Sequence, residues 1–180
     1  MSRRTQWMIV AGIIGLMGAG ALLGLKLAPD IFPVGVGARA PDFAAVDLEN
    51  GDSVQFARAY GGDVVLVNIW ATWCAPCRQE MPSMQKLHEA YADSGLKIVA
   101  VSVDQGPADA LREFQREYGL TFDILQDRTR AIERIYQTTA VPESFVIGRD
   151  GRIVKKVIGE YDWDSPAART LVSRLLQQGR

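Results

Sequence analysis

Metal-binding and reactive side chains are scarce in this sequence, which has two cysteines, Cys74 and Cys77, and one histidine, His88, among 180 residues. A structural zinc site takes four cysteine or histidine ligands, so this set is too small to form one. Covalent haem attachment requires a histidine directly after the second cysteine, where Arg78 stands instead. These absences exclude two common functions of a Cys-x-x-Cys pair.

The chain also lacks an excess of charge of either sign. Its 20 basic and 21 acidic side chains nearly balance, and proteins that bind nucleic acid usually carry a basic surface. We therefore exclude nucleic acid as a partner. With 48% hydrophobic and 23% charged residues, and without repeats or low-complexity tracts, the sequence is typical of a globular protein.

Ionisable side chains are missing altogether from Trp7–Leu25. A helix of this length, at 1.5 Å per residue, is about long enough to cross a hydrocarbon core of ~30 Å. Two arginines precede the stretch and a single lysine follows it closely, so the positive-inside rule places residues 1–6 in the cytoplasm. We expect an uncleaved signal-anchor helix. A signal peptide cleaved near Ala19 and Ala21 is the alternative.

Residues 26–39 contain several prolines and glycines and have no helical or alternating period, which predicts a linker. Strand-like and helix-like stretches then alternate through residues 40–180. Asn50-Gly51 favours a tight β-hairpin, and Val64–Ile69 is a continuous apolar run typical of a central buried strand. The later predicted elements are helix 77–92, strand 97–103, helix 107–118, strand 122–125, helix 129–136, strands 144–147 and 152–158, and helix 165–178. This order predicts one α/β domain with a mixed sheet sandwiched by helices.

The two cysteines lie in Trp73-Cys74-Ala75-Pro76-Cys77, where the predicted buried strand meets a helix. Unpaired backbone N–H groups and the dipole of the helix favour the thiolate form of Cys74. Cys77, one turn later, would be more covered and able to attack a mixed disulfide formed by Cys74. A static disulfide that closes so short a loop would stabilise the fold little. The pair therefore predicts a redox-active disulfide, with no bound metal and no other cofactor.

Residues 64–82 read VVLVNIWATWCAPCRQEMP, and they resemble the active-site region of bacterial membrane-anchored, thioredoxin-like thiol–disulfide oxidoreductases. The group that includes the cytochrome c maturation reductases is the most similar. The resemblance extends from Ala40 through Val141-Pro142-Glu143-Ser144-Phe145 to the last helix. It implies a thioredoxin-like fold whose domain lies on the periplasmic side of the cytoplasmic membrane. The implied activity is reduction of disulfides in exported proteins such as apocytochrome c, with electrons from a membrane thiol–disulfide donor.

Several positions take on roles through this resemblance. Pro142 matches the family's cis-proline, which lies beside the cysteine pair and presents neighbouring backbone, here that of Val141, to an extended peptide. Trp73 matches an exposed residue of the family's docking surface. The proline at position 76 resembles the residue that the reducing members of the family carry at that place. We therefore expect Trp73, Ala75, Pro76, Val141 and Pro142 to contact the substrate.

Two glutamates are the remaining candidates. Asn68 stands where cytoplasmic thioredoxins keep a buried aspartate that exchanges protons with the second cysteine, and asparagine cannot titrate. Glu80, one helical turn beyond Cys77, is predicted to take over this role. Glu143 resembles the glutamate that follows the cis-proline in the cytochrome c maturation members, and we expect it to contact the substrate too. Two carboxylates near the dithiol would favour basic substrate segments. Two solvated surface glutamates are the alternative interpretation.

Two other functions remain open at this point. A copper chaperone could use the cysteine pair, because Cu(I) can be held by two thiolates alone. A peroxidase of the related peroxiredoxin type is suggested by Ala40-Pro-Asp-Phe43. That class carries a threonine three residues before its peroxidatic cysteine, whereas this chain has Ala71 there.

Overall fold

The computed structural model describes residues 3–31 and 34–178, which belong to two separate units, Met1–Pro33 and Val34–Arg180. The first unit holds one helix, α1 (Arg3–Ile31), with large exposed apolar side chains such as Trp7 and Leu16. Judged on the described residues alone, no helix is both long and apolar enough to cross a membrane.

The boundary between the units differs from the predicted linker at 26–39. Helix α1 continues to Ile31, and the second unit already begins at Val34. The Gly37 N–H donates to the Ile153 carbonyl over 2.8 Å, and the Ile153 N–H donates to the Ala38 carbonyl over 2.9 Å. These pairings attach residues 34–39 to the domain. Residues 32–33 of the predicted linker, like residues 1–2 of the predicted cytoplasmic terminus, lie outside the described residues.

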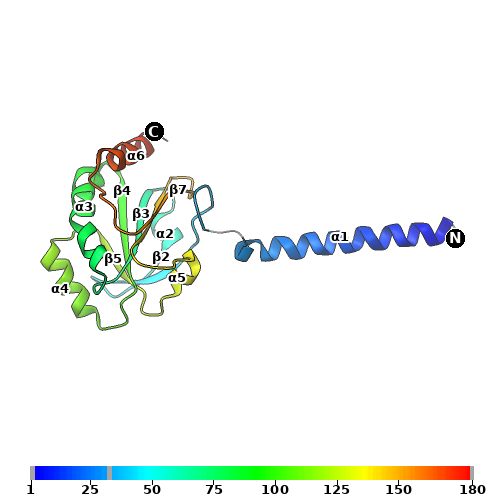
Figure 1. Ribbon diagram of the computed structural model, residues 1–180, viewed down its shortest axis with the longest axis horizontal. Helices are drawn as coiled ribbons and strands as arrows, with labels where there is room; N and C mark the ends of the chain where they lie inside the picture. The colour runs from blue at the N-terminus through cyan, green and yellow to red at the C-terminus, as the bar shows by residue number, and fades with distance from the viewer. Residues whose placement is uncertain (1–2, 32–33, 179–180) are drawn as a thin grey trace. The chain divides into compact units, whose positions relative to one another are not determined.

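Within the second unit, seven strands form one mixed sheet in the order β2-β1-β5-β4-β3-β6-β7 (Figure 1). Their bounds are β1 (Ala44–Asp47), β2 (Ser53–Gln55), β3 (Val64–Trp70), β4 (Leu96–Ser102), β5 (Asp123–Gln126), β6 (Glu143–Ile147) and β7 (Ile153–Ile158). Strands β3, β4 and β5 are parallel, while β6 runs antiparallel to β3 and β7 antiparallel to β6. The predicted hairpin is confirmed as the antiparallel pair β1 and β2.

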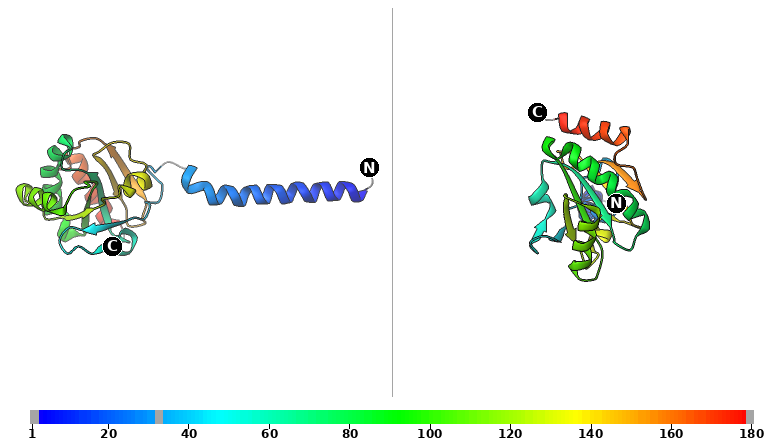
Figure 2. Two further views of the ribbon diagram at one scale, coloured as in Figure 1. Left: turned by 90° about the horizontal axis from the view of Figure 1, so that it is seen from below. Right: turned by 90° about the vertical axis from the view of Figure 1, so that its left-hand side faces the viewer.

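Helices cover both faces of this sheet (Figures 1 and 2). Their bounds are α2 (Phe56–Tyr60), α3 (Ala75–Tyr91), α4 (Ala108–Tyr118), α5 (Ala131–Tyr136) and α6 (Pro166–Gln177), with a 3-10 turn, η1, at Ala92–Ser94. Helices α3 and α6 lie side by side, and the Tyr91 hydroxyl of α3 donates to the Arg169 carbonyl of α6. On the opposite face, Tyr136 of α5 packs edge-on against Phe145 of β6. The predicted sandwich of helices around a mixed sheet is confirmed.

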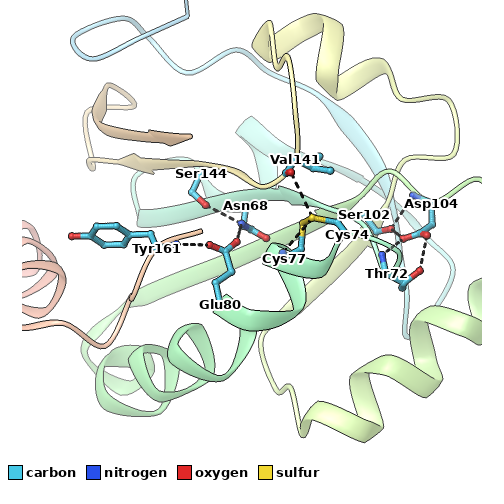
Figure 3. The surroundings of a disulfide bond; sticks show 10 residues. All are labelled: Asn68, Thr72, Cys74, Cys77, Glu80, Ser102, Asp104, Val141, Ser144 and Tyr161. Atoms are coloured by element: carbon cyan, nitrogen blue, oxygen red, sulfur yellow. Dashed lines mark hydrogen bonds between the residues drawn. A yellow bond between two sulfur atoms is a disulfide. The ribbon is translucent and has the colours of Figure 1, made fainter. Parts of the chain in front are cut away.

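Strand β3 lies in the centre of the sheet, and all seven of its side chains are buried. Its continuous apolar sequence suits a position with helices on both faces, and Asn68 is its one polar residue. Because only a short turn separates β3 from α3, Cys74 is brought to the N-cap of that helix. Figure 3 shows this turn at the end of the parallel strands. The core strand thereby fixes the location of the cysteine pair.

Candidate active site

Cys74 and Cys77 are joined by a disulfide at the start of α3 (Figure 3). Cys74 caps the helix, and its sulfur accepts a hydrogen bond from the Cys77 N–H over 3.2 Å. Cys74 is 5% exposed and Cys77 is fully buried. An incoming sulfur can therefore reach Cys74 but not Cys77. This asymmetry is the one expected for a nucleophilic and a resolving cysteine.

The loop that carries Pro142 lies against the disulfide. The Val141–Pro142 peptide bond is cis, as the resemblance implied. The carbonyl oxygen of Val141 lies 3.5 Å from the sulfur of Cys74. Behind it, the Pro142 carbonyl accepts a hydrogen bond from the Gly159 N–H over 2.8 Å. The residue that follows β7 thus fixes the backbone beside Cys74 through this hydrogen bond.

The residues on either side of Cys74 in the chain are exposed. Trp73 is 63% exposed, and Ala75 and Pro76 are also exposed. Ile158, which pairs with Glu143 across the end of the sheet, is 65% exposed. Trp73, Ala75 and Pro76, next to Cys74 in the chain, thus give an exposed and largely apolar surface beside a cysteine that is itself almost covered.

Glu80 lies inside the protein, so the interpretation of a solvated surface residue is wrong for it. Its side chain is 1% exposed, and its carboxylate accepts hydrogen bonds from Asn68 Nδ2 over 2.7 Å and from the Tyr161 N–H over 3.2 Å. Burial raises the pKa of Glu80 from 4.5 to about 7, although these hydrogen bonds oppose the shift. A carboxyl group with this pKa can both take up and release a proton near neutral pH.

Asn68 connects Glu80 to the sheet. Its Nδ2 also donates to the Ser144 hydroxyl of β6 over 2.8 Å. Its Oδ1 is buried and has no hydrogen-bond partner among the described residues. In Figure 3 this oxygen points toward the side on which the disulfide lies. A thiol of the reduced pair is a possible donor for it.

The structure does not bring Glu143 together with Glu80. The side chain of Ser144 joins the network on the α3 face of β6, and successive side chains of a strand point to opposite faces. Glu143 therefore faces the other side of the sheet, where its carboxylate pairs with the Lys156 ammonium over 2.6 Å. Its side chain is 1% exposed, so the solvated interpretation is wrong here too. The expectation of two carboxylates beside the dithiol is not met.

Comparisons with known proteins agree with this geometry. Residues 36–156 match the model of the AhpC/TSA family. The chain belongs to this family. Thiol-disulfide oxidoreductase ResA from Bacillus thuringiensis (strain Al Hakam) is 38% identical over 125 residues, which are 69% of this chain and 70% of ResA. ResA from Bacillus subtilis (strain 168) is 34% identical over 123 residues, which are 68% of this chain and 67% of that protein.

Among solved structures, a thiol:disulfide interchange protein DsbE from Chlorobium tepidum is 31% identical, with a TM-score of 0.70. The similarity covers 78% of this chain and 97% of that one. Together with the Cys-x-x-Cys pair, these relatives establish this AhpC/TSA family member as an enzyme of thiol–disulfide interchange. The thioredoxin-like fold is likewise established.

Three residues near the site of this AhpC/TSA family member make contacts that were not predicted from the sequence. Tyr161 donates to Glu80, Lys156 pairs with Glu143, and Asp104 binds the turn before Cys74. Of the three, Asp104 alone left a signal, because it stands two residues after the apolar strand β4, whose end lies beside the end of β3. Within residues 3–31 and 34–178, no three His, Cys, Asp or Glu side chains gather where they could hold a metal ion.

Proposed function

We propose that this enzyme works as a reductase of disulfides in exported proteins, with apocytochrome c as one substrate. The observation that carries the proposal is the buried carboxyl of Glu80 on the helix that bears both cysteines, with a pKa of about 7. A proton acceptor of this kind supports oxidation of the dithiol at neutral pH. Oxidation of the enzyme's dithiol is the half-reaction that a reductase performs on its substrate.

In the proposed first step, the thiolate of Cys74 attacks one sulfur of the substrate disulfide. A bond forms between Cys74 and that sulfur, the substrate S–S bond breaks, and the other substrate sulfur leaves as a thiolate. The backbone of Val141 and Pro142 and the exposed Trp73, Ala75 and Pro76 hold the substrate segment during this attack. Glu143 supports the loop from behind through its pair with Lys156.

In the second step, Cys77 loses its proton to Glu80 and attacks the sulfur of Cys74. The mixed disulfide breaks, the Cys74–Cys77 disulfide forms, and the second substrate sulfur leaves. Two electrons have passed to the substrate, and the proton held by Glu80 can return to a leaving thiolate. The reaction needs no cofactor besides the cysteine pair. A membrane thiol–disulfide donor would then reduce the pair again.

The reduction potential of the full-length protein tests the direction of this reaction. Equilibration with glutathione or dithiothreitol buffers should give a potential near that of thioredoxin, about −270 mV. A value near about −120 mV, which is typical of a strong disulfide donor, would contradict the proposed reductase. Tight Cu(I) binding without catalysed disulfide exchange would favour the copper chaperone instead.

We also propose that residues 7–25 anchor the enzyme in the bacterial cytoplasmic membrane as a single-pass signal anchor, with residues 1–6 in the cytoplasm. The absence of ionisable side chains from this stretch supports the proposal, as do the exposed apolar side chains of α1. After cell lysis and an alkaline carbonate wash, the intact protein should remain with the membranes. A C-terminal reporter should be active only outside the cytoplasm. A soluble mature form that begins near Leu22 would contradict the anchor.

A further inference from the structure

The turn before Cys74 is bound by a carboxylate from the neighbouring strand. Asp104 follows β4, and its Oδ2 accepts a hydrogen bond from the Thr72 N–H over 2.9 Å. Its Oδ1 accepts from the Thr72 hydroxyl over 2.8 Å. Both oxygens therefore hold the residue that stands two positions before the nucleophilic cysteine, as Figure 3 shows.

Asp104 is itself fixed by the sheet. Its Oδ2 accepts a further hydrogen bond from the Ser102 hydroxyl over 2.7 Å. Its backbone carbonyl accepts from Gln126 Nε2 over 2.9 Å, and the same Nε2 donates to the Gly106 carbonyl. Gln126 belongs to β5 and is buried. Asp104 is thus held by residues of two parallel strands, β4 and β5, and its carboxylate binds the turn from this fixed position.

We propose that Asp104 is a positioning residue for thiol–disulfide interchange and that it acts through Thr72. Residues 71–74 leave the strand ladder, and Cys74 must adopt an extended backbone conformation to cap α3. A turn fixed at Thr72 holds the Cys74 sulfur beside the Val141 carbonyl and keeps the Trp73 indole on the substrate side. Asp104 does not touch the reacting sulfurs. It stabilises the geometry in which they react.

The charge of Asp104 has a second consequence. Figure 3 shows the Asp104 carboxylate at the turn that leads into Cys74, at the same end of the sheet as the disulfide. A negative charge there opposes formation of the Cys74 thiolate. Asp104 therefore fixes the turn, and its charge also lowers the reactivity that the helix dipole gives to the Cys74 thiol. This inference rests on the established interchange activity and does not depend on the direction of the proposed reaction or on Glu80.

Three variants of the full-length protein separate these effects. Thr72→Val removes the hydroxyl donor but keeps the backbone N–H, and Thr72→Ser keeps both donors. We expect Thr72→Val to lower kcat/KM for a protein disulfide about 3- to 10-fold, which is the effect of one lost hydrogen bond. Thr72→Ser should restore the rate to within about twofold of the natural protein. Asp104→Asn removes the charge and should move the pH midpoint for alkylation of reduced Cys74 to lower pH.

Asp109→Asn is the matched control, because Asp109 is an exposed carboxylate that pairs with Arg112 on α4. It should leave both the rate and the alkylation profile unchanged. Urea unfolding of each variant measures how much of it is folded. The proposal is overturned if Thr72→Val reacts like the natural protein, if its loss of rate merely follows its unfolded fraction, or if Asp104→Asn does not move the alkylation midpoint. If Asp104→Asn fails to fold, the comparison of Thr72→Val with Thr72→Ser decides the question.

Discussion

The side-chain amide of Asn68 donates a 2.7 Å hydrogen bond to the carboxylate of Glu80, and both side chains are buried in the centre of the domain. Asparagine in the central strand cannot exchange a proton, so the titratable group of the site stands on α3 instead. The amide stabilises the ionised carboxylate while burial favours the protonated form. The balance leaves Glu80 with a pKa of about 7.

The first prediction concerns the kinetics of Glu80→Gln. Glutamine keeps the size of the side chain but cannot accept a proton, so the resolving attack by Cys77 should slow. The expected loss in rate is about 10²- to 10⁴-fold, the range for general acid–base catalysis, because burial gives water little access to replace the carboxylate. Stopped-flow measurement of enzyme oxidation against pH should also show that a step near pH 7 has disappeared.

Glu113→Gln provides the control for this experiment. Glu113 is an exposed glutamate on α4, so its substitution makes the same chemical change away from the cysteine pair. Its rate and pH profile should equal those of the natural protein. If Glu80→Gln also keeps the natural rate and profile, Glu80 does not act as the proton acceptor.

The second prediction links the same carboxyl to stability. The pKa of Glu80 is higher in the folded protein than its ordinary value, so the folded state loses stability as pH rises from 4.5 to about 7. The free energy of unfolding of the natural protein, relative to Glu80→Gln, should therefore fall by up to about 3 kcal/mol over this range. Urea unfolding of the disulfide-bonded proteins at pH 4, 5.5 and 8 measures the difference. A difference that is constant with pH would contradict the raised pKa.

The sequence predicted the elements that local patterns determine. The apolar run that became β3, the Asn50-Gly51 hairpin and the last helix, α6, were all predicted from such patterns. Local patterns also placed Cys74 at the start of a helix. Each of these features depends on residues close together in the chain.

Features that depend on distant contacts could not be predicted in this way. Whether Glu143 faces the α3 side or the α5 side of the sheet depends on the pairing of β6 with β3, and a shift of one residue would reverse it. The early start of the domain at Val34 depends on its hydrogen bond to Gln137, 103 residues away in the sequence. The binding of Thr72 by Asp104 likewise joins the ends of two parallel strands.

The third prediction separates the roles of the two cysteines. Cys77→Ser leaves Cys74 able to attack but removes the resolving thiol, so a mixed disulfide with the substrate should accumulate. Cys74→Ser should trap none, because Cys77 is fully buried. Non-reducing gel electrophoresis after acid quenching, followed by mass spectrometry, detects the adduct. Equal trapping by both variants would refute the assignment.

The last prediction concerns the buried pair on the opposite face of the sheet. Lys156→Met keeps a long unbranched side chain but removes the ammonium, which lies 5.2 Å from the centre of the Phe145 ring, and so leaves the Glu143 carboxylate without its cation. Loss of one partner from a fully buried pair costs about 3–5 kcal/mol, and the partial exposure of Lys156 reduces this to about 2 kcal/mol. Adding Glu143→Gln removes the unpaired charge, so the double variant should be more stable than Lys156→Met alone. Urea unfolding at pH 7 compares the natural protein with the single and the double variant, and equal stability of the two variants would show that the pair does not hold the loop behind Pro142.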